Sequence, residues 1–203
     1  MTGNVRDFGF QLKYYKYLAD NNRHSDALSL LTDNVFINPT DYNMTLLKEY
    51  YESLNDPKPF SDYWGNFVNT MGKSVPKIKI QFEKEELDLT HKPNSWIFID
   101  VWGTWCAPCI RELPDLQSFF IQNSNIDKSK LKIYTLSFGS QNLKEFMDKN
   151  SYTFPVTEID IQTNNLFEVT GYPTKILISP EGNYIKIPFG VDWKMYLKNY
   201  ALL

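Results

Sequence analysis

The stretch WIFIDVWGTWCAPCI, residues 96–110, decides the fold of this chain. Its first seven residues are almost continuously apolar, which is typical of a central strand buried on both faces. Asp100 interrupts this apolar run, and a carboxylate in a buried strand is costly unless it is paired, protonated or used. The C-x-x-C that follows, Cys106 to Cys109, points to a chemical use for that carboxylate.

The C-x-x-C lies where the strand ends and where a helix, expected over about residues 107–123, begins. Unpaired backbone N–H groups and the positive dipole end of a helix favour a thiolate, so Cys106 is the predicted nucleophile. Cys109 lies one turn later, close enough to attack a mixed disulfide on Cys106 and release the reduced partner. Pro108 suits an early helical position because its missing N–H would be unpaired anyway.

Two other uses of this motif have less support. A zinc half-site needs two more ligands, but the chain has no second cysteine pair and only two histidines, His24 and His91. A structural disulfide between residues three apart closes a very short loop and adds little stability. Redox exchange is therefore the expected chemistry, with a redox-active disulfide and with no metal or organic cofactor.

The periodicity of apolar residues divides the chain into two regions. Residues 1–72 predict three to four helices, with Ser25 and Ser61 as N-caps. From about residue 76, strands alternate with helices and end in a hairpin and a C-terminal helix, which predicts an α/β layered domain with a mixed central sheet. The strands are expected at 77–82, 96–102, 131–138, 155–159, 174–179 and 184–189. Besides the helix already named, helices are expected at 141–150 and 162–169.

The composition agrees with a globular protein and argues against some partners. Hydrophobic residues make up 42% and charged residues 22%, so a buried core is expected. A net charge of −3 without a basic block argues against nucleic acid as a partner. No apolar run approaches the ~18 residues that span a bilayer. The first residues carry no apolar signal core, so either the protein is cytosolic or a leader or anchor has been removed.

The motif WGTWCAPC at 102–109, the later GYPT at 171–174 and the strand order together resemble the thioredoxin superfamily. The closer resemblance is to the TlpA/ResA-like branch of thiol-disulfide oxidoreductases, which carries an extra strand–helix insertion similar to residues 155–169. The resemblance covers about residues 76–203. It implies a thioredoxin-like domain over 73–203 and leaves 1–72 as a helical addition, of a kind found in similar proteins of Bacteroidetes-type bacteria.

The resemblance implies a catalytic role for each matching residue. Cys106 matches the attacking cysteine and Cys109 the resolving cysteine. Asp100 matches an acidic residue beneath the thioredoxin active site, where burial raises a carboxyl pKa and where it would accept the proton of Cys109 through water. Glu112 matches an acidic residue that ResA-like proteins place near the site. Pro114 matches the proline that bends the active-site helix.

Other interpretations of the two carboxylates stay open. Glu112 has the alternative of being a solvated charge on a helix surface. Asp100 has the alternative of being a buried aspartate with satisfied hydrogen bonds and no catalytic role. Some ResA-like proteins carry an uncharged residue at its position, so Asp100 is a thioredoxin-like feature on a TlpA-like chain.

The resemblance also implies a substrate-binding surface beside the dithiol. Pro173 matches the family's cis-proline, which faces the C-x-x-C. With Tyr172 it would offer an extended backbone edge to a substrate segment, as in strand addition. Trp105 is expected to pack beside the first cysteine and shield the disulfide. The predicted substrate-contacting residues are Trp105, Ala107, Pro108, Tyr172 and Pro173.

The function implied is dithiol–disulfide exchange with protein substrates, in the reducing direction because Ala107-Pro108 is close to the Gly-Pro pair of thioredoxins. An upstream electron donor would regenerate the dithiol, and TlpA-like proteins work in the periplasm or anchored to a membrane facing it. Two other classes stay open. One is a thiol peroxidase, with Thr104 and Arg111 as supporting residues. The other is a partner-binding module in which residues 1–72 hold the partner and the dithiol is inert.

Overall fold

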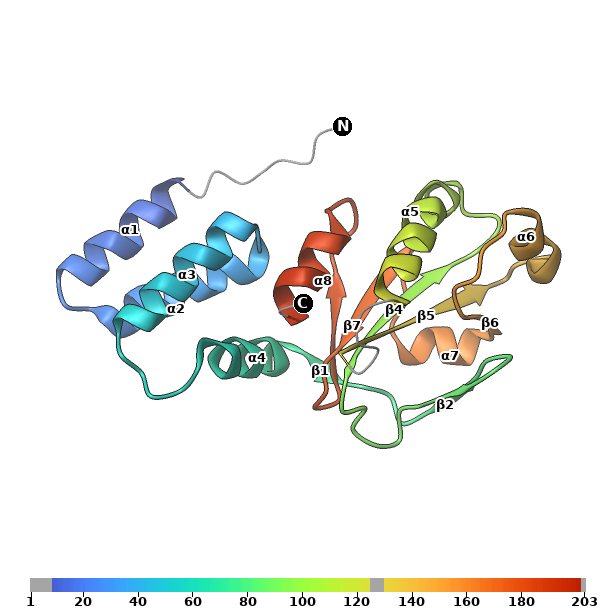
Figure 1. Ribbon diagram of the computed structural model, residues 1–203, viewed down its shortest axis with the longest axis horizontal. Coiled ribbons are helices and arrows are strands. Elements are labelled where there is room, and N and C mark those ends of the chain that lie inside the picture. The colour runs from blue at the N-terminus through green and yellow to red at the C-terminus, as the bar shows by residue number, and fades with distance from the viewer. Residues whose placement is uncertain (1–8, 125–129, 202–203) are drawn as a thin grey trace. The chain divides into compact units, whose positions relative to one another are not determined.

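The computed structural model describes residues 9–124 and 130–201, and the chain divides into two compact units. One unit contains the helices that precede residue 71 together with the segment that follows residue 189. The other unit spans Met71–Phe189 and contains the C-x-x-C. In Figure 1 the helices of the first unit are blue to teal, with α8 in red.

All secondary-structure elements in the described residues of the first unit are helices, as the sequence predicts for the region before residue 72. Its helices are α1 (Gly9–Asp20), α2 (His24–Ile37), α3 (Asp41–Ser53), α4 (Phe60–Met71) and α8 (Trp193–Ala201). Both predicted caps are wrong, because α2 begins one residue before Ser25 and α4 one residue before Ser61. Arg23 precedes α2 without a side-chain cap. A side-chain cap does occur on α3, where the Thr40 hydroxyl accepts the Asn43 N–H at 3.2 Å.

The C-terminal helix α8 belongs to the helical unit, a grouping that the sequence did not signal. Trp64 Nε1 donates a buried hydrogen bond to the Asn199 carbonyl at 2.8 Å. The Tyr196 hydroxyl donates to the carbonyl of Ile37 at 2.6 Å, and the Asn199 amide to that of Pro39 at 2.5 Å. The last two bonds satisfy carbonyls at and just after the end of α2, where the helix leaves them unpaired. The predicted division into residues 1–72 and 73–203 stays a prediction.

The second unit is built on a six-stranded mixed sheet in the order β1-β8-β7-β4-β5-β6, which confirms the predicted thioredoxin-like α/β architecture. Strands β4, β5 and β6 run parallel, whereas β7 lies antiparallel to β4, β8 to β7 and β1 to β8. The sheet strands are β1 (Lys73–Ser74), β4 (Trp96–Trp102), β5 (Leu131–Phe138), β6 (Val156–Ile159), β7 (Thr174–Ile178) and β8 (Asn183–Ile187). The remaining elements are the hairpin of β2 (Lys79–Gln81) with β3 (Glu86–Asp88), and the helices α5 (Ala107–Ser124), α6 (Leu143–Lys149) and α7 (Ile161–Leu166).

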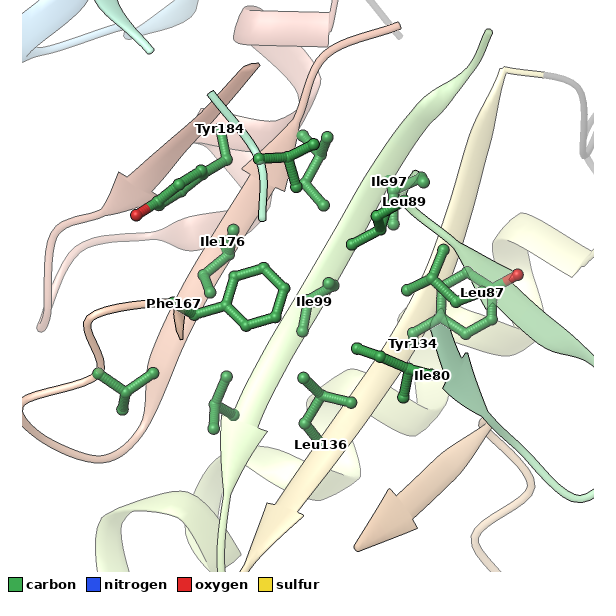
Figure 2. Packing of buried hydrophobic residues seen from close by; sticks show 14 of the residues in the cluster. Ile80, Leu87, Leu89, Ile97, Ile99, Tyr134, Leu136, Phe167, Ile176 and Tyr184 are labelled. Atoms are coloured by element: carbon green, nitrogen blue, oxygen red, sulfur yellow. The ribbon is translucent and has the colours of Figure 1, made fainter. Parts of the chain in front are cut away.

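The two faces of β4 have different surroundings, because successive side chains of a strand point to opposite faces. Ile97 and Ile99 belong to an apolar cluster with Ile176 of β7, Leu136 of β5 and Phe167, which follows α7. Figure 2 shows these side chains gathered on one face of the sheet. Phe98, Asp100 and Trp102 therefore point to the opposite face. This alternation places the Asp100 carboxylate between Phe98 and Trp102, on the face of the sheet where Glu112 of α5 contacts Lys175 of β7.

Candidate active site

The two cysteines form a disulfide at the junction of β4 and α5. The Cys106 N–H donates to the Gly103 carbonyl at 3.0 Å, which closes a turn after the strand. Helix α5 then begins at the next residue, and the Ile110 N–H donates to the Cys106 carbonyl at 3.0 Å. Cys106 and Cys109 are bonded with an S–S distance of 2.05 Å. The chain thus places the first sulfur at the N-terminus of an 18-residue helix, as the sequence predicts.

The environments of the two sulfurs differ in a way that favours attack by the first. The backbone N–H of Cys109 donates to Sγ of Cys106 at 3.3 Å. Cys106 is 5% exposed and Cys109 is 1% exposed. A hydrogen bond donated to sulfur at a helix N-terminus stabilises the thiolate of the reduced state. Of the other motif residues, Ala107 is exposed and Pro108 is half-buried within the first turn of α5.

Asp100 does not stand alone in the buried strand β4, because a buried lysine joins it to a second carboxylate. Lys175 of β7 pairs directly with Asp100 of β4 in the antiparallel register. Its Nζ lies 3.4 Å from Oδ1 of Asp100 and 2.5 Å from Oε2 of Glu112. Asp100 and Lys175 are both buried, whereas the Glu112 side chain is 35% exposed. The three side chains form a charged cluster, the Asp–Lys–Glu cluster, that extends from the core towards solvent.

The pKa of Asp100 is raised from its ordinary value of 3.8 to about 6. Burial is the largest cause, because the low-dielectric interior disfavours the charged carboxylate. The ammonium of Lys175 opposes this effect, and the nearby Glu112 carboxylate adds to it. A carboxyl group that titrates near pH 6 is ionised in the neutral range and can still take up a proton, which is what a general base requires.

Lys175 is the residue that sequence reasoning missed. It is the only charged residue of strand β7, TKILI, and it lies two positions after Pro173. A lysine in an otherwise apolar strand needs a partner when it is buried. The signal was therefore present in the sequence, but the identity of the partner depends on the pairing of β7 with β4. The roles assigned to Asp100 and Glu112 stay predictions, although the structure does bring the two carboxylates together.

Three aromatic rings pack against one another and are called here the aromatic wall: Trp105, which directly precedes Cys106 in the chain, Phe138 and Tyr172. The rings of Trp105 and Tyr172 meet edge to face at 5.1 Å, and those of Phe138 and Tyr172 stack at 5.8 Å with an interplanar angle of 4°. Trp105 Nε1 donates to the Phe138 carbonyl at 2.9 Å. Trp105 nevertheless remains 55% exposed, so it presents much of its surface to solvent beside the disulfide.

The predicted substrate-contacting residues occupy two segments, one from Trp105 into the first turn of α5 and one in the loop before β7. Tyr172 of the second segment contacts Trp105 of the first, so these two come together. The peptide bond between Tyr172 and Pro173 is cis, and Pro173 is buried. That Pro173 faces the C-x-x-C and that these residues bind a substrate segment stay predictions.

The residues considered for other chemistries do not form a second site within residues 9–124 and 130–201. No group of three or more metal-ligating side chains occurs in this part of the chain. His24 is exposed and lies 3.2 Å from the Tyr50 hydroxyl in the helical unit. Thr104 contributes its backbone N–H to the Ser140 hydroxyl at 2.9 Å, and Arg111 is exposed on α5. Pro114 lies inside α5, as predicted.

The sheet topology, the disulfide at a helix N-terminus and the cis-proline loop define a thioredoxin-like thiol-disulfide oxidoreductase. Comparison with known proteins agrees with this class. Residues 71–186 match the model of the AhpC/TSA family, and the chain belongs to that family.

Curated relatives carry the same chemistry in their names. The chain is 27% identical to the thiol-disulfide oxidoreductase ResA of Bacillus subtilis over 136 residues, which cover 65% of this chain and 74% of the relative. It is 30% identical to ResA of Geobacillus thermodenitrificans over 135 residues, covering 64% and 75%. It is 29% identical to the sporulation thiol-disulfide oxidoreductase A of Bacillus subtilis over 135 residues, covering 63% and 80%.

Solved structures share the fold of about two thirds of this chain. A thioredoxin-family thiol:disulfide interchange protein from Chlorobium tepidum aligns with a TM-score of 0.54 at 17% identity, covering 64% of this chain and 95% of that one. The thioredoxin domain of a thiol-disulfide oxidoreductase from Bacteroides vulgatus aligns with a TM-score of 0.53 at 19% identity, covering 64% and 96%. At these identities the likeness concerns the fold.

Proposed function

We propose that this protein reduces disulfide bonds in partner proteins. The observation that carries the proposal is the hydrogen bond from the Cys109 N–H to Cys106 Sγ at the start of α5, on the same helix as one carboxylate of the Asp–Lys–Glu cluster. The motif residues Ala107-Pro108 support the reducing direction through their closeness to the thioredoxin pair. The named activity of the ResA relatives supports thiol-disulfide exchange.

The reaction proceeds in two exchanges. In the reduced protein, the Cys106 thiolate attacks one sulfur of the partner disulfide, and the other partner sulfur leaves as a thiolate. The Cys109 thiol then gives its proton to Asp100, directly or through water, and its sulfur attacks Sγ of Cys106. The mixed disulfide breaks, the second partner sulfur leaves as a thiolate, and Cys106 and Cys109 become disulfide-bonded. Two electrons pass from the dithiol to the partner.

Lys175 and Glu112 serve the second exchange through Asp100. The lysine ammonium holds part of the Asp100 population ionised despite its burial, because an opposite charge favours the carboxylate. Glu112 shares the same ammonium at 2.5 Å. It is partly exposed, so the cluster has one member in exchange with solvent.

The reducing cycle needs an upstream dithiol donor, and the resemblance to TlpA/ResA-like proteins supports a location outside the cytoplasm. None of the helices in the described residues is long and apolar enough to cross a bilayer. Fractionation of the native host with an antibody against this chain tests the location, and recovery in the cytoplasm alone would contradict it.

The experiment that tests the proposed direction is equilibration of the Cys106–Cys109 pair against dithiothreitol and glutathione buffers. A reduction potential near about −250 to −270 mV is expected for a reductase. A value near roughly −120 mV would identify an oxidant of the DsbA kind and would overturn the proposed direction. Peroxide consumption that survives Cys109→Ser would instead favour a thiol peroxidase.

A further inference from the structure

A buried asparagine of α7 holds one ring of the aromatic wall from behind. Asn164 is 4% exposed, and its Oδ1 accepts a hydrogen bond from the Tyr172 hydroxyl at 2.7 Å. Its backbone N–H donates to the Asp160 carbonyl at 3.0 Å, and its carbonyl accepts the Val169 N–H at 3.2 Å. The polar groups of Asn164 are thus engaged, and the Tyr172 ring is tied to α7 as well as to its own loop.

Helix α7 is itself a firm support for this contact, although it is only six residues long. Asp160 caps its N-terminus, the carboxylate accepting the Thr163 N–H at 2.7 Å. Phe167 at its C-terminal end is fully buried in the apolar cluster, and Figure 2 shows its ring directed towards Ile99 and Ile176. Asn164 therefore lies between two anchored ends, and the position of the Tyr172 hydroxyl is fixed to the core.

The polar groups of the aromatic wall are used inside the protein. The Trp105 indole N–H donates to the Phe138 carbonyl, and the Tyr172 hydroxyl donates to Oδ1 of Asn164. What Trp105 and Tyr172 offer to a partner is mainly ring carbon. A surface of ring carbon gains free energy from burying an apolar side chain and gives little to a polar one.

We propose that Asn164 is a positioning residue that fixes Tyr172 in the aromatic wall, and that the wall selects partner segments with an apolar side chain next to the reacting cysteine. Trp105 directly precedes Cys106, and Tyr172 contacts Trp105. A partner cysteine bonded to Cys106 therefore brings its neighbouring side chain to the aromatic wall. This inference rests on the proposed function and adds the substrate class. Through Asn164, the strand–helix segment of residues 155–169 would then contribute to substrate specificity.

The test compares two disulfide-bonded peptides that differ only in the residue preceding each cysteine, leucine in one and serine in the other. Hydroxyethyl disulfide, which has no such residue, serves as the third substrate. Wild-type protein is expected to show a KM about tenfold lower for the leucine peptide with a similar kcat, since apolar contacts discriminate by about tenfold or more. Asn164→Leu is expected to raise KM for the leucine peptide and bring the two peptides within about twofold.

The control and the rescue separate positioning from general damage. Asn165→Leu makes the same change at an exposed position of the same helix and should keep the tenfold preference. Asn164→Asp keeps an oxygen that accepts the Tyr172 hydroxyl but loses the Nδ2 donor to the Val169 carbonyl at 3.4 Å, so it should keep part of the preference that Asn164→Leu loses. Tyr172→Phe removes the hydroxyl but keeps the ring, and it should lose preference as Asn164→Leu does, with no further loss in the double variant. If Asn164→Leu fails to fold, Tyr172→Phe carries the test.

Three results would overturn the inference: equal KM values for the two peptides in the wild type, equal losses on all three substrates in Asn164→Leu, or a preference in Tyr172→Phe as strong as in the wild type. The exchange can also be run with the dithiol forms of the peptides and oxidised protein. A leucine preference in that direction without net reductase activity would overturn the proposed function and leave the inference standing.

Discussion

Replacing Asp100 with asparagine is expected to make the protein more stable and less active at neutral pH. The folded state raises the pKa of this carboxyl from 3.8 to about 6, chiefly because burial disfavours its charge. Each pKa unit corresponds to about 1.4 kcal/mol, so the ionised carboxylate costs the folded state about 3 kcal/mol above pH 6. Asparagine has nearly the same shape and no charge. The gain should therefore be about 1–3 kcal/mol, since some relaxation around the charge reduces the full value.

The sign of the pH dependence follows from proton binding. Between pH 4 and 6 the folded protein holds more protons at Asp100 than the unfolded chain does, so wild-type stability falls as the pH rises through this window. Asp100→Asn lacks this contribution. The difference between variant and wild type should be small at pH 4, grow up to pH 6 and stay constant above it.

The assay is urea unfolding of the oxidised protein at pH 4, 5, 6, 7 and 8, followed by far-UV circular dichroism. Amide hydrogen exchange along β4 assigns the transition of the unit that holds the site. In parallel, the resolution of a preformed mixed disulfide is measured at pH 7 and should slow by about tenfold or more. A stability difference independent of pH, or a variant less stable than wild type at pH 8, would refute this account of Asp100.

Three further substitutions test the remaining structural claims. Lys175→Met should raise the pKa of Asp100 further, because it removes the opposite charge. The pH profile of mixed-disulfide resolution should then move to higher pH by about one unit or more. The control Lys186→Met removes a charge on the opposite sheet face and should leave the profile in place. Gly103→Ala places a Cβ 2.6 Å from Trp105 Nε1, so it should lower the free energy of unfolding in urea by about 1–3 kcal/mol. In the control Gly171→Ala the new Cβ meets nothing within 4 Å. An equal loss in both variants would contradict this prediction. Trp64→Phe leaves the Asn199 carbonyl without its 2.8 Å donor and should lower the unfolding free energy of the helical unit by about 1–3 kcal/mol. A loss below about 0.5 kcal/mol by calorimetry would refute the importance of that hydrogen bond.

Local pattern predicted the parts of the site that lie close together along the chain. The apolar run of β4, its single carboxylate and the C-x-x-C at the start of α5 lie within residues 96–110, and each has a signature that depends only on neighbours. The order of the longer strands and helices followed from periodicity for the same reason, whereas the short strands β1 and β3 were not predicted. The predicted caps at Ser25 and Ser61 were wrong because a local pattern places a helix end only to within one or two residues, and both serines lie inside the first turn of their helices.

The contacts between distant segments were decided by the tertiary structure. Lys175 meets Asp100 because β7 pairs with β4 in one register, and a shift of one residue would point the lysine to the other face. Asn164 meets Tyr172 through the path of the loop between α7 and β7, which periodicity does not encode.

The sequence by itself determined which chemistry this protein carries, because a nucleophilic dithiol at a helix start is a local arrangement. The tertiary structure decided how that chemistry is tuned, because burial and charge pairing act through space. It also decided that α8 joins the helical unit, through bonds between residues more than 130 positions apart. Chain entropy and packing choose such partners only when the whole fold is assembled.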